Sequence, residues 1–269
     1  MCLSVIKKQY DQFANEYYHD FDSSMQFQNL KNLFNYLVQI KPDVSNKKWL
    51  DAGCGPGSLS KLKNEFFPKS VMGIDISKEM IQIAQKTNFY DCCRVGSLTH
   101  LKDLQNQNYD IYFSNTVFHW LNFEGNGFFK KSLQEAYRVL KPKGLIALSL
   151  SGLGTAHQFI DAYQKTTNQT KDVLGSENLF KVVDLFEECG FYVELAKLEF
   201  EPVQFNHPLE YVEAVEKYGK EIYLASFQHL PKDERDQIFK KIGETFIQTI
   251  GNQKYRHKQY MIYIIGKKL

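Results

Sequence analysis

The stretch Trp49-Leu-Asp-Ala-Gly-Cys-Gly-Pro-Gly57 decides the fold of this chain. A short apolar run ends in an acidic residue, Asp51, and glycines then occupy positions 53, 55 and 57. Glycine lets the backbone pass close to a ligand where a Cβ atom would collide. A strand that ends in an acid and continues into such a loop is typical of a nucleotide crevice at the carboxyl edge of a parallel sheet.

A second apolar run, Val71-Met-Gly-Ile-Asp75, also ends in an acid. A carboxylate in this place can accept hydrogen bonds from ribose hydroxyls, which carry no charge. The glycine pattern alone is a weak signal, but its combination with Asp51 and Asp75 is specific. The sequence therefore predicts a nucleoside pocket over the ends of two neighbouring strands.

The composition sets limits on the partners of the chain. Its 269 residues are 43% apolar, and the formal net charge is +2. We therefore expect a single domain over residues 1–269 with a full core, and neither a nucleic-acid nor a membrane partner. No run approaches the roughly 18 apolar residues of a spanning helix, so we expect a soluble, cytoplasmic protein. The five cysteines and seven histidines show no metal-ligand spacing, and no metal is expected.

Strand and helix patterns alternate along most of the chain. This alternation predicts an α/β fold with a doubly wound, mostly parallel seven-stranded sheet. Helices over residues 1–45 precede the first strand, and a helical insertion over residues 208–250 precedes the last. The expected strands are 49–51, 71–75, 92–95, 109–114, 145–150, 191–203 and 260–265; the expected helices between them are 58–66, a helix capped by Ser77, 127–140, 156–166 and 177–188.

Two kinds of ligand compete for the glycine loop. A dinucleotide site usually has G-x-G-x-x-G, because the helix that follows receives a pyrophosphate at its N-terminus. Here the spacing is G-x-G-x-G, and Asp51 stands directly before the loop. An acid there would repel a pyrophosphate and attract an ammonium group. The charge therefore favours S-adenosylmethionine, which has an ammonium, a sulfonium and no phosphate.

The chain resembles the class I S-adenosylmethionine-dependent methyltransferases. Four stretches carry the resemblance: Leu50–Gly57, Gly73–Ser77, Tyr109–Asn115 and Tyr137–Gly144. It covers about residues 45–150 and implies a Rossmann-like methyltransferase fold. It also implies cofactor roles for the matching positions: Asp51, Gly53, Cys54, Gly55 and Gly57 at the methionine part; Asp75 at the ribose; Ile76, Ser97 and Leu98 at the adenine; Asn115 and Thr116 near the methyl group. The family often has an acid that accepts from the adenine amino group, whereas this chain has Ser97.

Further matches suggest a subgroup. The order Tyr10-x-x-Phe13-Ala14-x-x-Tyr17 and the segment Ser114–Trp120 resemble the malonyl-[acyl-carrier protein] O-methyltransferases of biotin synthesis, with His119 where glutamine is usual. Trans-aconitate and juvenile hormone acid methyltransferases have a similar tryptophan-containing segment. All three classes methylate carboxylates. The resemblance thus implies an acid as acceptor, either a small molecule or one carried on acyl carrier protein.

A carboxylate is already a nucleophile at neutral pH, so this chemistry needs positioning and no general base. We expect Tyr17, His119 and Trp120 to border the acceptor pocket beneath a lid formed by residues 1–45 and a cap formed by 208–250. A buried carboxylate also needs a cationic or multi-donor partner. Arg256 is the preferred candidate, ahead of Lys254 and Lys217, because guanidinium can bind a carboxylate through two parallel hydrogen bonds.

Alternative functions are methylation of another small acid, N- or C-methylation of a small metabolite, and non-catalytic adenosyl binding. The complete pair of Asp51 and Asp75 argues against the last of these.

Overall fold

The computed structural model describes residues 3–20, 25–121, 127–170, 176–251 and 253–269. The described residues form one seven-stranded sheet in the order β3-β2-β1-β4-β5-β7-β6. The strands are β1 (Lys48–Ala52), β2 (Ser70–Asp75), β3 (Cys92–Val95), β4 (Tyr109–Asn115), β5 (Leu140–Ser151), β6 (Phe191–Phe205) and β7 (Tyr255–Lys268). β1 to β5 are parallel, and β7 is antiparallel to both of its neighbours. The predicted doubly wound, mostly parallel sheet is confirmed.

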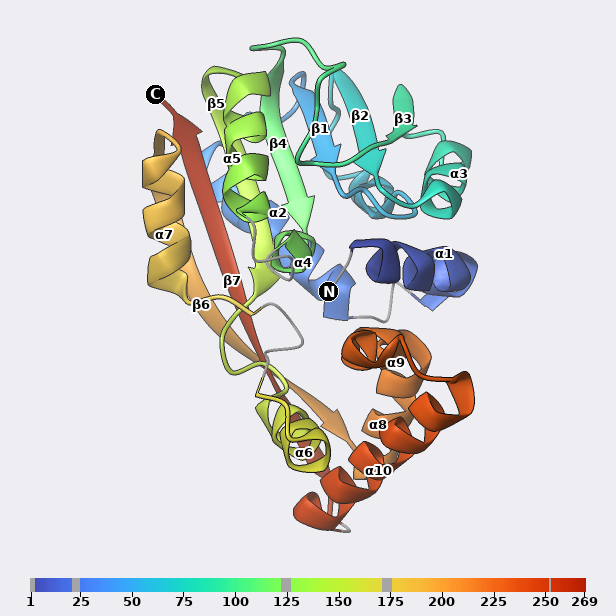
Figure 1. Cartoon of the computed structure of the whole chain (residues 1–269). Coiled ribbons are helices and arrows are strands. Elements are labelled where there is room, and N and C mark those ends of the chain that lie inside the picture. Colours follow the sequence, from blue (N-terminus) through green and yellow to red (C-terminus); the bar gives the residue numbers. More distant parts are fainter. Residues whose placement is uncertain (1–2, 21–24, 122–126, 171–175, 252) are drawn as a thin grey trace.

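Helices cover both faces of this sheet (Figure 1). They are α1 (Leu3–Asp20), α2 (Met25–Ile40), α3 (Lys78–Lys86), α4 (Phe118–Leu121), α5 (Phe128–Val139), α6 (His157–Thr167), α7 (Leu179–Glu188), α8 (Pro208–Tyr218), α9 (Lys220–Tyr223) and α10 (Lys232–Ile250). Leu33 and Leu37 of α2 pack with Trp49 on one face, while Leu133 of α5 and Phe186 of α7 lie in the core of the other. None of the helices described is long and apolar enough to cross a lipid bilayer.

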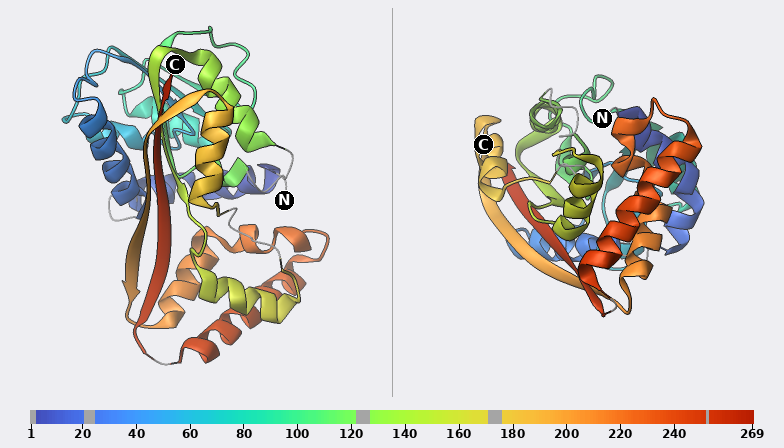
Figure 2. Two further views of the ribbon diagram at one scale, coloured as in Figure 1. Left: turned by 90° about the vertical axis from the view of Figure 1, so that its left-hand side faces the viewer. Right: turned by 60° about the horizontal axis from the view of Figure 1, so that its bottom comes forward.

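β6 and β7 extend well beyond the carboxyl end of β5 as a two-stranded ribbon (Figure 2). They pair with each other as far as Phe205 and Tyr255, so both strands are longer than predicted. Helices α6, α8, α9 and α10 pack at the far end of this ribbon and form a third core, rich in aromatic residues. We call these four helices the cap. The sequence placed the cap in residues 208–250 alone, but Phe159 and Tyr163 of α6 also belong to its core.

The two N-terminal helices have different positions. α2 covers the sheet, whereas α1 lies between the carboxyl edge of the sheet and the cap (Figure 1). α1 contacts α3 and α4 on the side of the sheet and α9 on the side of the cap. Ile6 of α1 packs against Ile222 of the cap. Within the described part of the predicted N-terminal layer, α1 is therefore the helix that lies between the carboxyl edge and the cap.

Two local predictions were wrong. The helix expected over residues 58–66 is a single 3₁₀ turn, η2 (Ser58–Leu62). The chain leaves this turn early, and Phe66 packs against both Phe34 and Trp49 before β2 begins. The strand expected over residues 145–150 begins earlier, at Leu140, and residues 141–144 lie within β5, where Lys143 has a positive φ of 64° and the register against β4 shifts. The pairing with β4 is interrupted there, and it resumes at Leu145 opposite Ile111.

Candidate functional site

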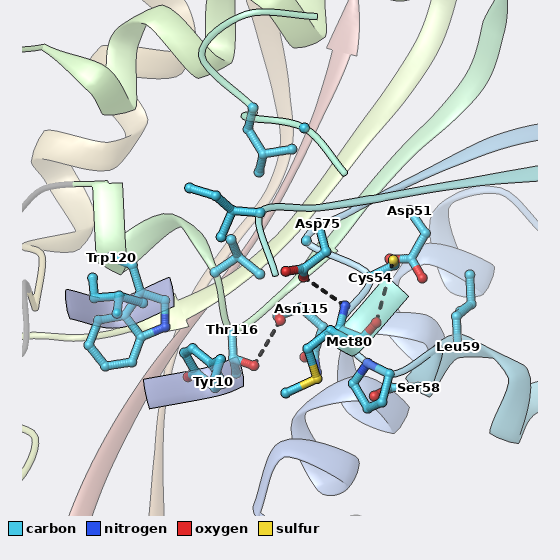
Figure 3. Close-up of a pocket in the computed structure, with 18 of the residues that line it drawn as sticks. Tyr10, Asp51, Cys54, Ser58, Leu59, Asp75, Met80, Asn115, Thr116 and Trp120 are labelled. Atoms are coloured by element: carbon cyan, nitrogen blue, oxygen red, sulfur yellow. Dashed lines mark hydrogen bonds between the residues drawn. The ribbon is translucent and has the colours of Figure 1, made fainter. Parts of the chain in front are cut away.

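A pocket opens at the carboxyl edge of β1, β2 and β4 (Figure 3). Segments distant in the sequence meet there: the glycine loop, the residues after β2, β3 and β4, and two residues of α1. The lining residues are Ile6, Tyr10, Leu30, Asp51, Gly53, Cys54, Gly55, Pro56, Ser58, Leu59, Asp75, Ile76, Met80, Gly96, Ser97, Leu98, Asn115, Thr116, Val117, Trp120 and Leu121. The structure thus brings together most of the residues that the sequence assigned to a cofactor.

Asp75 is held in place by the backbone around it. Its two carboxylate oxygens accept hydrogen bonds from Gly55 N at 2.9 Å and from Ser77 N at 2.8 Å. Ser77 also caps α3 by accepting from Met80 N. Burial raises the pKa of Asp75 above its usual range. A carboxylate has about four acceptor positions, so it can still accept hydrogen bonds from a ligand in the pocket.

Asp51 is 4% exposed at the end of β1. The Tyr90 hydroxyl donates a hydrogen bond to its Oδ2 at 2.7 Å. Burial raises the pKa of Asp51 to about 7, although the bond from Tyr90 opposes that shift. A cation placed beside this carboxylate would restore its charge. Tyr90 was missed by the sequence analysis because nothing in its local sequence pairs it with a residue 39 positions away.

The three glycines of the loop have different roles. A Cβ on Gly53 would lie 2.4 Å from Val117 Cγ2, whereas one on Gly55 would meet nothing within 4 Å. Gly55 therefore leaves open space where the backbone borders the pocket. Gly57 does not line the pocket; a Cβ there would lie 3.1 Å from the backbone of Ala84 in α3. Cys54 lines the pocket, and its side chain is buried beside Cys93.

A strained turn follows β4. Thr116 has a φ of 57°, an outlier for a β-branched residue. The Ser149 hydroxyl stabilises this turn by accepting from Thr116 N at 3.0 Å and donating to Asn115 Oδ1 at 2.6 Å. Asn115 also donates to the Gln26 carbonyl of α2. Ser149, which the sequence analysis did not single out, thus fixes the part of the pocket where the methyl group was expected.

The acceptor residues named from the sequence are scattered. Trp120 lines the pocket and packs edge-on against Tyr10, with ring centroids 6.4 Å apart. His119 lies behind Trp120, outside the lining, and burial lowers its pKa to about 3. Arg256 is exposed on β7 and does not line the pocket. The side chain of Tyr17 lies outside the described part of the structure.

The other two candidate cations also lie elsewhere. Lys254 is exposed, and Lys217 of α8 pairs with Glu16 of α1 at 3.3 Å. Among the described residues that line the pocket there is no lysine, arginine or histidine. Two carboxylates without a cation suit an ammonium and ribose hydroxyls, and they do not suit a pyrophosphate. No cluster of metal-ligating side chains occurs in the described ranges.

Comparisons with known proteins agree with this geometry. Residues 50–148 match the family model described as a methyltransferase domain. A malonyl-[acyl-carrier protein] O-methyltransferase of Dechloromonas aromatica is 34% identical over 129 residues, 47% of this chain and 45% of that protein. The protein of the same name from Priestia megaterium is 28% identical over 201 residues, 69% of this chain and 66% of that protein. The chain thus spans between about half and two thirds of these curated relatives.

Two solved structures show the same fold. The YcgJ protein of Bacillus subtilis is 16% identical, with a TM-score of 0.56 over 86% of this chain and 96% of that one. A Haemonchus contortus phosphoethanolamine N-methyltransferase, solved with S-adenosylhomocysteine, is 20% identical, with a TM-score of 0.51 over 88% of this chain and 52% of that one. Residues 50–148 of this chain therefore match a methyltransferase domain, and the described residues share the fold of these two structures.

Proposed function

We propose that this protein transfers a methyl group from S-adenosylmethionine to the free carboxylate of a malonyl thioester carried on acyl carrier protein. The observation that carries the methyl-donor part is the pocket with two acids, the buried Asp51 and the half-buried Asp75, and, among its described lining residues, no cation. The acceptor part is supported by the relatives named malonyl-[acyl-carrier protein] O-methyltransferase.

The cofactor would lie along the carboxyl edge of the sheet. Asp51 would hold the ammonium group, and Asp75 would accept from the ribose hydroxyls. Gly53, Cys54 and Gly55 would border the methionine part, while Ile76, Ser97 and Leu98 would border the adenine. Asn115 and Thr116 would border the reacting end. The cofactor supplies an activated methyl group on its sulfonium.

The residues of this chain would then position an acceptor that is already charged. Tyr10 and Trp120 close the pocket beside the turn after β4, and excluding water there leaves the acceptor oxygen unsolvated and reactive. His119 is not placed to act as a base, because it is buried outside the lining and its lowered pKa makes it a weak proton acceptor. A carboxylate acceptor needs no proton removed, which agrees with a pocket where the two acids serve the cofactor.

Assays of methyl transfer to malonyl-acyl carrier protein, malonyl-CoA and trans-aconitate, run side by side, test the acceptor. We expect turnover with the malonyl thioester on the carrier and weaker turnover with the CoA thioester. Turnover with trans-aconitate alone would favour the alternative of a small-molecule acid methyltransferase. Methylation of amine or carbon acceptors without any acid would overturn the carboxylate proposal.

A binding measurement tests the cofactor separately. S-Adenosylhomocysteine should raise the melting temperature, because a ligand that binds only the native state stabilises it by mass action. NAD at the same concentration is the control and should have no effect. Stabilisation by NAD without stabilisation by the nucleoside would contradict the assignment.

A further inference from the structure

A hydrogen-bonded chain leads from the pocket to the surface through the segment after β3. Ser97 Oγ lies 2.9 Å from Thr99 Oγ1, and Thr99 Oγ1 lies 2.8 Å from His100 Nδ1. On the other side of the imidazole ring, His100 Nε2 lies 2.8 Å from Lys131 Nζ. The segment between β3 and β4 crosses toward α5, which carries Lys131 (Figure 1).

The chemistry of the outer end sets the direction of every hydrogen bond in this chain. A lysine ammonium has three donors and no acceptor, so His100 Nε2 must accept. The proton of the neutral imidazole then lies on Nδ1, which donates to Thr99 Oγ1. Thr99 is 3% exposed and its hydroxyl has one proton, which it must donate to Ser97.

Ser97 Oγ therefore accepts a hydrogen bond from the Thr99 hydroxyl, and it accepts a second one from Thr99 N at 3.4 Å. A hydroxyl oxygen has two lone pairs and one proton, so the group that remains for a ligand is the Ser97 O–H donor. Without Lys131 the hydrogen bonds from His100 to Ser97 could run in the opposite direction, and Ser97 would then present an acceptor to the ligand.

We propose that Ser97, oriented by Thr99, His100 and Lys131, donates a hydrogen bond to the edge of the nucleoside base. This inference rests on the proposed function, which places the base beside Ile76, Ser97 and Leu98. It reverses the role of the acid that the family often has in this place, which accepts from the amino group of adenine. A donor at this edge accommodates a 6-oxopurine, whose oxygen accepts, at least as well as a 6-aminopurine. Ser97 is thus a specificity-determining residue, and Lys131 is a positioning residue.

Calorimetry with S-adenosylhomocysteine and its inosyl analogue tests the proposal on the full chain. For the wild type we expect the two dissociation constants to agree within about threefold. Ser97→Asp, whose carboxylate can only accept, should favour the adenosyl compound by about tenfold or more, equivalent to one charged hydrogen bond. Lys131→Met should shift the preference in the same direction by a smaller factor.

Lys130→Met is the matched control. Lys130 also lies on α5, pairs with Glu188 and is not part of the chain to Ser97, so this variant should keep the wild-type ratio. A wild-type preference for the adenosyl compound above about tenfold, abolished by Ser97→Ala, would show that Ser97 accepts and overturn this inference alone. Failure of both compounds to bind a folded protein would overturn the proposed function together with it.

Discussion

The two sides of the pocket are constructed in different ways. On the side of β1 and β2, residues from a single run of sequence, 51–77, hold one another through hydrogen bonds such as the one that Gly55 N donates to the Asp75 carboxylate. On the side of β4, the wall consists of Trp120 and Tyr10, which approach each other only because α1 lies across the edge of the sheet. The first side is fixed by local geometry and the second by the docking of a separate helix. Changes on the first side should therefore affect cofactor binding strongly, and changes on the second should affect mainly the acceptor and the rates of opening.

The largest effect is expected at Gly53, with Gly55 as its matched control. Both have positive φ, 74° and 54°, so alanine strains either backbone by roughly 1–2 kcal/mol. Only at Gly53 does the new Cβ collide with Val117, which adds roughly 1–3 kcal/mol of overpacking. Gly53→Ala should lower the free energy of unfolding by about 2–5 kcal/mol and Gly55→Ala by about half as much, measured by chemical denaturation. Equal losses of unfolding free energy in the two variants would mean that Val117 moves aside and accommodates the new Cβ atom.

Asp75 comes next, with Asp91 as control. Asp75→Asn should weaken S-adenosylhomocysteine binding by roughly 10- to 150-fold in calorimetry, the cost of about 1.5–3 kcal/mol for a hydrogen bond to a charged group. Asp91 makes a similar bond from its carboxylate to a backbone N–H, that of Val71, but it does not line the pocket. Asp91→Asn should reduce stability and leave affinity unchanged. A common loss of affinity in both variants would point to a general loosening of β2.

This contrast also explains what could be predicted from the sequence. Asp51, Asp75 and the glycine loop are recognisable because strand, turn and acid are adjacent in the chain. Tyr90 and Ser149 complete the same pocket through contacts between neighbouring strands, and their own surroundings in the sequence give no sign of it. Seven strands and their order of appearance followed from periodicity, whereas strand lengths did not, because β6 and β7 extend each other by pairing.

The misplaced start of the last strand explains why the sequence analysis expected Arg256 near the acceptor. With the last strand expected to begin at Tyr260, residue 256 could be placed freely near the pocket. The strand in fact begins at Tyr255, and Tyr255 and His257 point into the core of the cap. Successive side chains in a strand alternate between faces, so Arg256 points outward. On the proposed function, an acceptor carboxylate would therefore find its partners among groups other than Arg256.

Asp51 gives the cofactor side a pH dependence. Because its pKa is raised to about 7 in the folded protein, its contribution to stability is present below about pH 4 and is lost as the pH rises through about 7. An ammonium ligand needs the ionised form, so its binding should have the opposite dependence. Lowering the pH from about 7.5 to about 6 should weaken S-adenosylhomocysteine binding by roughly 5- to 10-fold, with proton release on binding. Calorimetry in buffers of different ionisation enthalpy measures that release.

Tyr90→Phe sharpens the same prediction. The variant removes the hydroxyl that donates to Asp51 and leaves the ring in place, so the pKa of Asp51 should rise further. The loss of affinity should then begin at a higher pH than in the wild type. Identical profiles for the two proteins would show that Asp51 does not hold the ammonium group.

The smallest effect is expected on the side of α1, which we propose acts as a lid. Asp11 pairs with Lys7 at 2.7 Å and accepts from the Ser77 hydroxyl, so it joins α1 to the residue after β2. Asp11→Ala should speed dissociation of S-adenosylhomocysteine by about 2- to 10-fold in stopped-flow displacement, since a hydrogen bond of this kind contributes about 0.5–1.5 kcal/mol. Asp43 forms a similar pair with Lys47 between α2 and β1, which makes Asp43→Ala the control. Unchanged dissociation in the Asp11 variant, with acceptor turnover also unchanged, would mean that α1 does not close over the cofactor, and that the two sides of the pocket differ in their construction but not in their dynamics.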